Sequence, residues 1–159
     1  MKKVLLILLL SSVISCSSDN DSDMAQDLII GEWKPIKTVE VYTNGDEDIY
    51  TLSECESKSI VTIEESGHFF VEYFEEIENG ICEQIIGGMF QSGSWTKLSE
   101  YKYRFEYECY LPDCDETLVE IPDKITFPTE NSMIVRFNED DDDDDDDVEY
   151  YYYEYVRNN

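Results

Sequence analysis

The sequence contains little positive charge. Its 159 residues include 11 Lys and Arg against 38 Asp and Glu, which gives a formal net charge of −27. Proteins bind phosphate groups through clustered Lys and Arg side chains, and no such cluster exists here, so nucleic acid is a poor partner. The same shortage of cations disfavours direct adsorption to an anionic lipid surface.

Histidine and catalytic motifs are also scarce. His68 is the only histidine and follows the turn signal Glu65-Ser66-Gly67, so we interpret it as an exposed turn residue. No Gly-x-Ser-x-Gly or HExxH motif is present. With 38 acidic residues, any two carboxylates could be proposed as a glycosidase pair, and the proposal carries no information. We therefore expect no enzymatic activity, no cofactor and no catalytic metal.

Long hydrophobic runs are absent too. The N-terminal apolar segment, counted from Val4 to Ile14, has 11 residues, whereas a membrane-spanning helix needs about 20. Lys2 and Lys3 precede this segment and small residues follow it. A positive start, a short apolar segment and a small-residue exit are typical of a secretory signal peptide.

The end of this signal carries a cysteine, and Val13-Ile14-Ser15-Cys16 resembles the bacterial lipoprotein signal. In that family the cysteine receives a diacylglycerol on its sulfur, and cleavage before it is followed by acylation of its amine by a fatty acid such as palmitate. The resemblance implies a signal peptide over residues 1–15 and a membrane anchor on Cys16. The alternative is ordinary secretion, which would leave Cys16 as a free thiol.

Residues 16–27 are polar and acidic without periodicity, which predicts a flexible tether. An acidic stretch directly after the lipidated cysteine resembles the signal by which some Gram-negative bacteria send lipoproteins to the outer face of the outer membrane. The resemblance therefore implies an outer-membrane lipoprotein exposed at the cell surface, with the periplasmic face as the alternative.

Removing Cys16 from the five cysteines leaves an even number: Cys55, Cys82, Cys109 and Cys114. Four cysteines allow three connectivities. An oxidising compartment favours disulfides over a zinc site, and no C-x2-C pair is present. We expect Cys55–Cys82, which would enclose two strands and contribute about 3–4 kcal/mol in the chain-entropy model, and Cys109–Cys114, which would bracket a turn.

From Leu28 onward the pattern is that of β-strands. In Tyr101–Cys109 aromatic residues alternate with charged ones, a period of two that buries one face. No helix-period segment is present beyond the signal. Eight strands are expected: Glu32–Tyr42, Ser59–Glu65, Phe69–Glu75, Ile85–Lys97, Tyr101–Cys109, Thr117–Phe127, Met133–Asn138 and Val148–Arg157. Short turns between them predict one all-β domain over 28–159, an eight-stranded up-and-down antiparallel barrel, with a sandwich as the alternative.

Several short motifs resemble those of lipocalins. Gly31-Glu32-Trp33 resembles the family's Gly-x-Trp signature, in which the Trp plugs the closed end of an eight-stranded barrel. Arg157 matches the family's Arg that packs over this ring. Gly93-Ser94-Trp95 and the segment 62–69 resemble the mid-domain Gly-x-Trp and second hairpin of bacterial lipocalin-like lipoproteins. The resemblance implies a lipocalin-like barrel closed by Gly31, Trp33 and Arg157.

A lipocalin-like barrel implies a small apolar or amphipathic ligand. The inward-facing residues expected to line it are Val61, Ile63, Phe69, Val71, Trp95, Tyr103 and Phe105. These side chains are bulky, so the alternative is a structural lipoprotein whose barrel is filled and whose loops contact an envelope partner or divalent ions. The tyrosines of the Tyr-rich end, VEYYYYEYVR, are interpreted as strand formers whose hydroxyls reach the rim, with a pocket lining as the alternative.

An acidic run occupies residues 139–147. An EF-hand loop needs spaced ligands, a central Gly and a terminal Glu, and this run has no Gly. Because like charges repel, we expect a solvated loop without a metal site. Divalent cations would gather only diffusely along its eight aspartates, which are Asp140, Asp141, Asp142, Asp143, Asp144, Asp145, Asp146 and Asp147.

Overall fold

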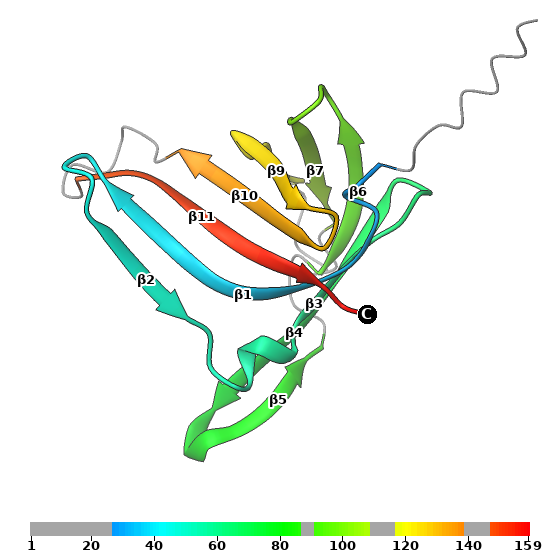
Figure 1. The fold of residues 1–159 in the computed structure, drawn as a ribbon. Helices are drawn as coiled ribbons and strands as arrows, with labels where there is room; N and C mark the ends of the chain where they lie inside the picture. The colour runs from blue at the N-terminus through cyan, green and yellow to red at the C-terminus, as the bar shows by residue number, and fades with distance from the viewer. Residues whose placement is uncertain (1–26, 87–90, 109–116, 139–146) are drawn as a thin grey trace, which may run out of the picture.

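The computed structural model describes residues 27–86, 91–108, 117–138 and 147–159 as an all-β antiparallel structure (Figure 1). Two short 3-10 helices accompany the strands, and no helix in the described part of the chain is long and apolar enough to span a membrane. The elements are β1 (Gly31–Tyr42), β2 (Glu47–Thr51), η1 (Glu56–Lys58), β3 (Ile60–Ile63), β4 (His68–Ile77), η2 (Glu78–Gly80), β5 (Ile81–Ile85), β6 (Ser92–Lys97), β7 (Tyr103–Tyr107), β8 (Leu118–Glu120), β9 (Lys124–Thr129), β10 (Ser132–Asn138) and β11 (Val148–Arg157).

The main path of the sheet follows the order β8-β7-β6-β4-β3-β1-β11-β10-β9, with β2 paired to β1 and β5 paired to β4. Neighbours on this path are mostly consecutive in the chain, as an up-and-down meander requires. The sheet has 11 strands and is not closed over the described residues. The prediction of an all-β antiparallel fold is confirmed, and the closed eight-stranded barrel is not.

One strand, β2, was not predicted, and two predicted strands each contain parts of two separate strands; each difference has a local reason. β2 is exposed at all five positions, so it has no alternating pattern to reveal it. Ile85–Lys97 was expected as one strand, but Ile85 ends β5, the return arm of a hairpin on β4, and β6 begins at Ser92. Thr117–Phe127 likewise contains parts of β8 and β9 rather than one strand.

The sheet is interrupted between β8 and β9, which are the two ends of its path. Only Ile121, Pro122 and Asp123 separate them in the chain. Pro122 has no backbone N–H to donate to a ladder, and its side chain is fully buried. A backbone hydrogen bond from the N–H of Ile125 to the carbonyl oxygen of Tyr101, at 2.8 Å, connects the start of β9 to the segment before β7.

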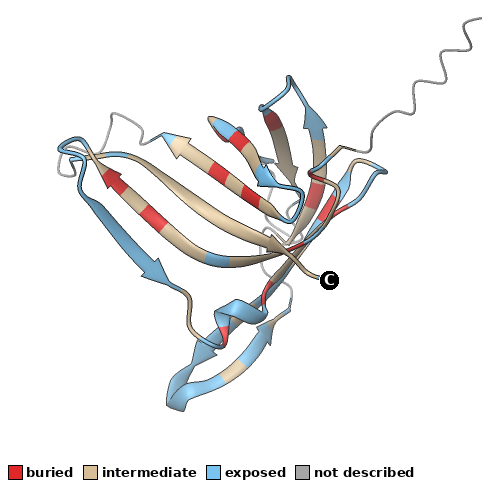
Figure 2. Cartoon of the chain, viewed as in Figure 1, coloured by how far each residue is buried: buried red, intermediate tan, exposed pale blue. Residues whose placement is uncertain are grey.

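The main hydrophobic cluster gathers Ile29 and residues of β1, β3, β4, β7, β9 and β10. Its fully buried members include Trp33 of β1, Ile125 of β9, and Ile29 in the segment before β1. Figure 2 shows buried positions alternating with half-buried ones along β1 and β10, whereas β2 and most of β5 are exposed. The core therefore belongs to the main path, and the β2 and β5 arms extend beyond it.

Candidate ligand-binding cavities

One end of the sheet is held together by Arg157. Its guanidinium carbon lies 4.4 Å from the centre of the Trp33 ring, so the contact expected between these two residues is present. The same guanidinium donates hydrogen bonds to the carbonyl oxygens of Leu28, Ile30 and Glu130, each at 2.8 Å. The indole N–H of Trp33 donates to the Ile29 carbonyl at 2.7 Å. The end of β11 is thus tied to the segment that precedes β1.

Both Gly-x-Trp glycines occupy positions where a side chain does not fit. A Cβ on Gly31, whose φ is +138°, would collide with Nη1 of Arg157. A Cβ on Gly93 would collide with the backbone carbonyl of Glu106 on the adjacent β7. The two glycines therefore allow Arg157 and β7 to approach β1 and β6 closely.

Asp27 fixes the start of the described chain to β6 and β7. Its carboxylate accepts hydrogen bonds from Tyr103 Oη at 2.8 Å and from Lys97 Nζ at 2.7 Å, and it also accepts one from the Ile29 N–H. Burial alone would raise the pKa of Asp27, but these donors outweigh burial and hold the pKa below its usual value. Tyr103 thus directs its hydroxyl to Asp27, and it lines neither of the two cavities described below.

The concave side of the sheet forms a partly open cavity of about 230 Å³, here called the inner cavity. Its apolar part includes Ile29, Ile125 and Met133 from the buried core. Eight of its 17 lining residues are aromatic, and five of those are tyrosines. One lining residue, Glu120, is charged; it lies at the interruption between β8 and β9.

A second cavity of about 410 Å³, here called the side cavity, adjoins the first. The two share Val61, Val71, Tyr73, Tyr153 and Tyr155 as lining residues. The side cavity lies where β1 and β4 separate: β3 pairs with both but has only four residues. Beyond β3, β1 pairs with β2 and β4 pairs with β5, and the segment around η1 spans the space between.

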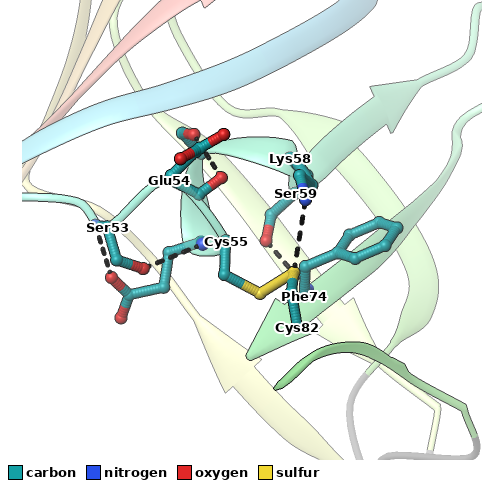
Figure 3. Close-up of a disulfide and its surroundings, with 9 residues drawn as sticks. Ser53, Glu54, Cys55, Lys58, Ser59, Phe74 and Cys82 are labelled. Atoms are coloured by element: carbon teal, nitrogen blue, oxygen red, sulfur yellow. Dashed lines mark hydrogen bonds between the residues drawn. A yellow bond between two sulfur atoms is a disulfide. The ribbon is translucent and has the colours of Figure 1, made fainter. Parts of the chain in front are cut away.

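The disulfide Cys55–Cys82 joins these two arms, as predicted. Figure 3 shows it linking the η1 segment to β5. Beside it, the N–H of Phe74 donates to Oγ of the buried Ser59 at 3.0 Å, and Nζ of Lys58 lies 3.6 Å from Sγ of Cys82. The η1 segment and the β4–β5 hairpin both line the side cavity, so the disulfide fixes two of its walls.

The tyrosines of β11 face the cavities at every second position. Tyr151, Tyr153 and Tyr155 line the inner cavity, whereas Tyr150 and Tyr152 lie on the opposite face with Arg136 and Lys124. The hydroxyls of these tyrosines were expected at the rim of the sheet, with a pocket lining as the alternative. Three of the tyrosines form part of the cavity wall. Burial raises the pKa of Tyr153 and Tyr155, and the negative charge of Glu120 raises both further. Their hydroxyls therefore remain protonated at neutral pH.

Five of the seven residues predicted to line a cavity do so, and two do not. Val61, Ile63, Phe69, Val71 and Phe105 line the inner cavity. Tyr103 bonds to Asp27 instead, and neither Tyr103 nor Trp95 is among the residues that line the inner or the side cavity. The indole N–H of Trp95 donates to the Glu64 carbonyl at 2.9 Å, at the turn before β4.

Other predicted sites lie outside the described residues: Cys16, Cys109, Cys114, and the aspartates from Asp140 to Asp146. Asp147 is described and exposed, and its carbonyl oxygen accepts a hydrogen bond from the Thr43 N–H at 2.7 Å. In the described part of the chain no group of three or more His, Cys, Asp or Glu residues is placed to hold a metal ion.

A comparison with protein-family models and with curated proteins finds no match to this chain. The cavities and their chemistry are therefore interpreted from their own geometry.

Proposed function

We propose that this chain is a lipid-anchored, lipocalin-like binding module that holds a small apolar or amphipathic ligand on the concave side of its sheet. The observation that carries the proposal is the pair of adjoining cavities, of about 230 Å³ and 410 Å³. Small-molecule sites usually measure about 300–1,000 Å³ and combine apolar walls with a few polar groups. The aromatic lining with its tyrosine hydroxyls and one carboxylate fits that description.

The strand order supports the relation to an eight-stranded barrel. If β8 and β9 are counted as two halves of one strand broken at Pro122, the main path has eight positions in up-and-down order. On this interpretation β2 and β5 are additions to a barrel whose seam lies between β8 and β9. The contact of Arg157 with Trp33 supports the same relation.

The proposed location follows from the N-terminal sequence. A cysteine acylated at position 16 would hold the domain at the outer membrane through the tether of residues 16–27, with the binding module facing the cell surface or, as the alternative, the periplasm. Fatty-acid labelling of the wild type and of Cys16→Ala tests the anchor, and equal labelling of the two would contradict it.

Native mass spectrometry of the chain purified from its own cells tests ligand binding. We expect a small-molecule mass that leaves on denaturation. Val71 lines both cavities, so Val71→Trp should fill the space and remove this mass, whereas Val119→Trp on the exposed β8 surface should retain it. Equal occupancy of the two variants would place the molecule elsewhere and contradict the proposal.

A further inference from the structure

Glu120 is the one charged residue that lines the inner cavity. Its carboxylate accepts a hydrogen bond from the hydroxyl of Tyr107 at 2.8 Å. The ion pairs formed among the described residues are Lys37–Glu154, Lys97–Asp27, Arg104–Glu106 and Arg136–Asp123. Glu120 takes part in none of them, although it is half-buried.

The chain supplies no positive charge to either cavity. Of the 11 Lys and Arg residues, all but Lys2 and Lys3 lie in the described part of the chain, and none of these lines the inner or the side cavity. The single histidine, His68, does not line them either. Lys102 and Asp123 border an adjoining hollow, which shares Glu120, Phe137 and Tyr151 with the inner cavity. The side cavity adds two more carboxylates, those of Glu56 and Glu75.

Aromatic rings surround the space next to Glu120. Phe137 stacks on Tyr151 with ring centres 5.3 Å apart, and Tyr151 meets Tyr153 edge to face at 5.9 Å. Tyr107 packs against Phe69 at 4.9 Å on the opposite wall. Ring faces attract organic cations, most strongly where water is excluded. A carboxylate among such rings favours a cation over a neutral group and repels an anion.

We propose that the ligand of the inner cavity is an organic cation with an apolar tail, whose ammonium group lies against Glu120 and the neighbouring tyrosine rings. The tail extends along the apolar lining toward Ile125 and Met133. This inference rests on the proposed function, because it specifies the ligand class of the same cavity. It disfavours fatty acids as ligands, because their carboxylate would meet Glu120 in a cavity whose own lining contains no Lys or Arg.

Calorimetric titration with three compounds of equal chain length tests the inference. Octyltrimethylammonium, octanol and octanoate are titrated into the full chain carrying Cys16→Ser, so that no attached acyl chain competes for the cavity. The two charged compounds are kept below their micellar concentrations and octanol below its solubility limit. We expect the cation to bind about tenfold more tightly than octanol, and octanoate to bind most weakly.

Glu120→Gln should remove the preference for the cation, measured as the ratio of cation affinity to octanol affinity within the same variant. Glu106→Gln is the matched control: it removes the same charge on the neighbouring β7, but Glu106 pairs with Arg104 and lines neither cavity. We expect this control to keep the preference. If Glu120→Gln proves unstable, Glu120→Asp, which retracts the carboxylate, should reduce the preference.

The outcomes separate the two proposals. Binding of octanol or octanoate at least as tight as that of the cation would overturn the cation assignment and leave the binding function intact. A cation preference that survives Glu120→Gln would overturn the role of Glu120. Failure of all three compounds to bind would contradict the binding function itself.

Discussion

Replacing Arg157 with Ala removes every contact that its guanidinium makes at the end of the sheet. The side chain stacks on Trp33 and donates to three carbonyl oxygens, those of Leu28, Ile30 and Glu130. Because Leu28 and Ile30 precede β1 and Glu130 lies between β9 and β10, the substitution would loosen both neighbours of the β11 terminus. The loss of stability should therefore exceed the loss caused by replacing an ordinary surface arginine with Ala.

The magnitude follows from the surroundings of each contact. The bond to Ile30 is partly buried and, as a bond from a charged donor, is worth about 1.5–3 kcal/mol. The contact with the Trp33 ring adds about 0.5–2 kcal/mol. The bonds to Leu28 and Glu130 are exposed, and water replaces them at little cost. The free energy of unfolding should fall by about 2–5 kcal/mol.

Urea denaturation followed by circular dichroism measures this change, with an expected midpoint shift of about 1–2.5 M. Arg157→Lys should lie between the wild type and Arg157→Ala, because an ammonium keeps the ring contact but cannot reach all three carbonyls. Arg136→Ala is the control: its guanidinium also lies over a tyrosine ring, that of Tyr150 at 4.6 Å, but its other contacts are to the side chains of Asp123 and Asn138 and not to carbonyl oxygens before β1. We expect it to cost about 0.5–1.5 kcal/mol. Equal effects of Arg157→Ala and Arg136→Ala would refute the reasoning.

Three further substitutions test the framework around the cavities. Gly93→Ala should destabilise the fold by about 1–3 kcal/mol in urea titrations, because its Cβ would overlap the backbone carbonyl of Glu106 on β7. An unchanged urea midpoint would contradict this close approach. Asp27→Asn should cost about 1–3 kcal/mol at pH 7. Because the pKa of Asp27 is lower in the folded state than its usual value, this contribution is fully present above about pH 4 and is lost as the pH falls through the folded-state pKa. The gap between the thermal melts of wild type and variant should therefore narrow as the pH falls below about 4, and a constant gap would count against this ion pair. Replacing both Cys55 and Cys82 with Ser removes a cross-link between residues 27 positions apart. The free energy of unfolding measured in urea titrations should fall by about 3–4 kcal/mol. A fall of less than about 1 kcal/mol would indicate that other contacts hold the two arms together.

The sequence is informative where a residue type has one structural use. The contact at the end of β11 is an example. The planar guanidinium of Arg157 stacks on the large ring of Trp33, and it can approach β1 because Gly31 has no side chain. The alternation in Tyr101–Cys109 likewise predicts which side chains of β7 face inward, and Phe105 does so. Pairing of Cys55 with Cys82 was predictable because few cysteines are present.

Other features could not be predicted because nothing local distinguishes them. β2 has no buried residue, so its pairing with β1 leaves no hydrophobic pattern. The break at Pro122 was visible as a proline, but a strand edge also tolerates proline. Glu120 is one of 38 acidic residues, and only the fold shows that it faces a cavity while others face solvent. Tyr103 and Trp95 have the inward alternation of lining residues, yet Tyr103 is engaged by Asp27 and Trp95 by the carbonyl of Glu64.

The most direct test of the binding function is to locate a bound alkyl chain by nuclear Overhauser effects in solution. The chain with methyl-labelled Ile, Val and Met is titrated with octyltrimethylammonium. The account predicts contacts from the octyl methylenes to the methyl groups of Val61, Val71 and Met133, which line the inner cavity. Contacts confined to the exposed side chains of Ile49 and Val119 would place the ligand on the outer surface and contradict a binding site inside the sheet.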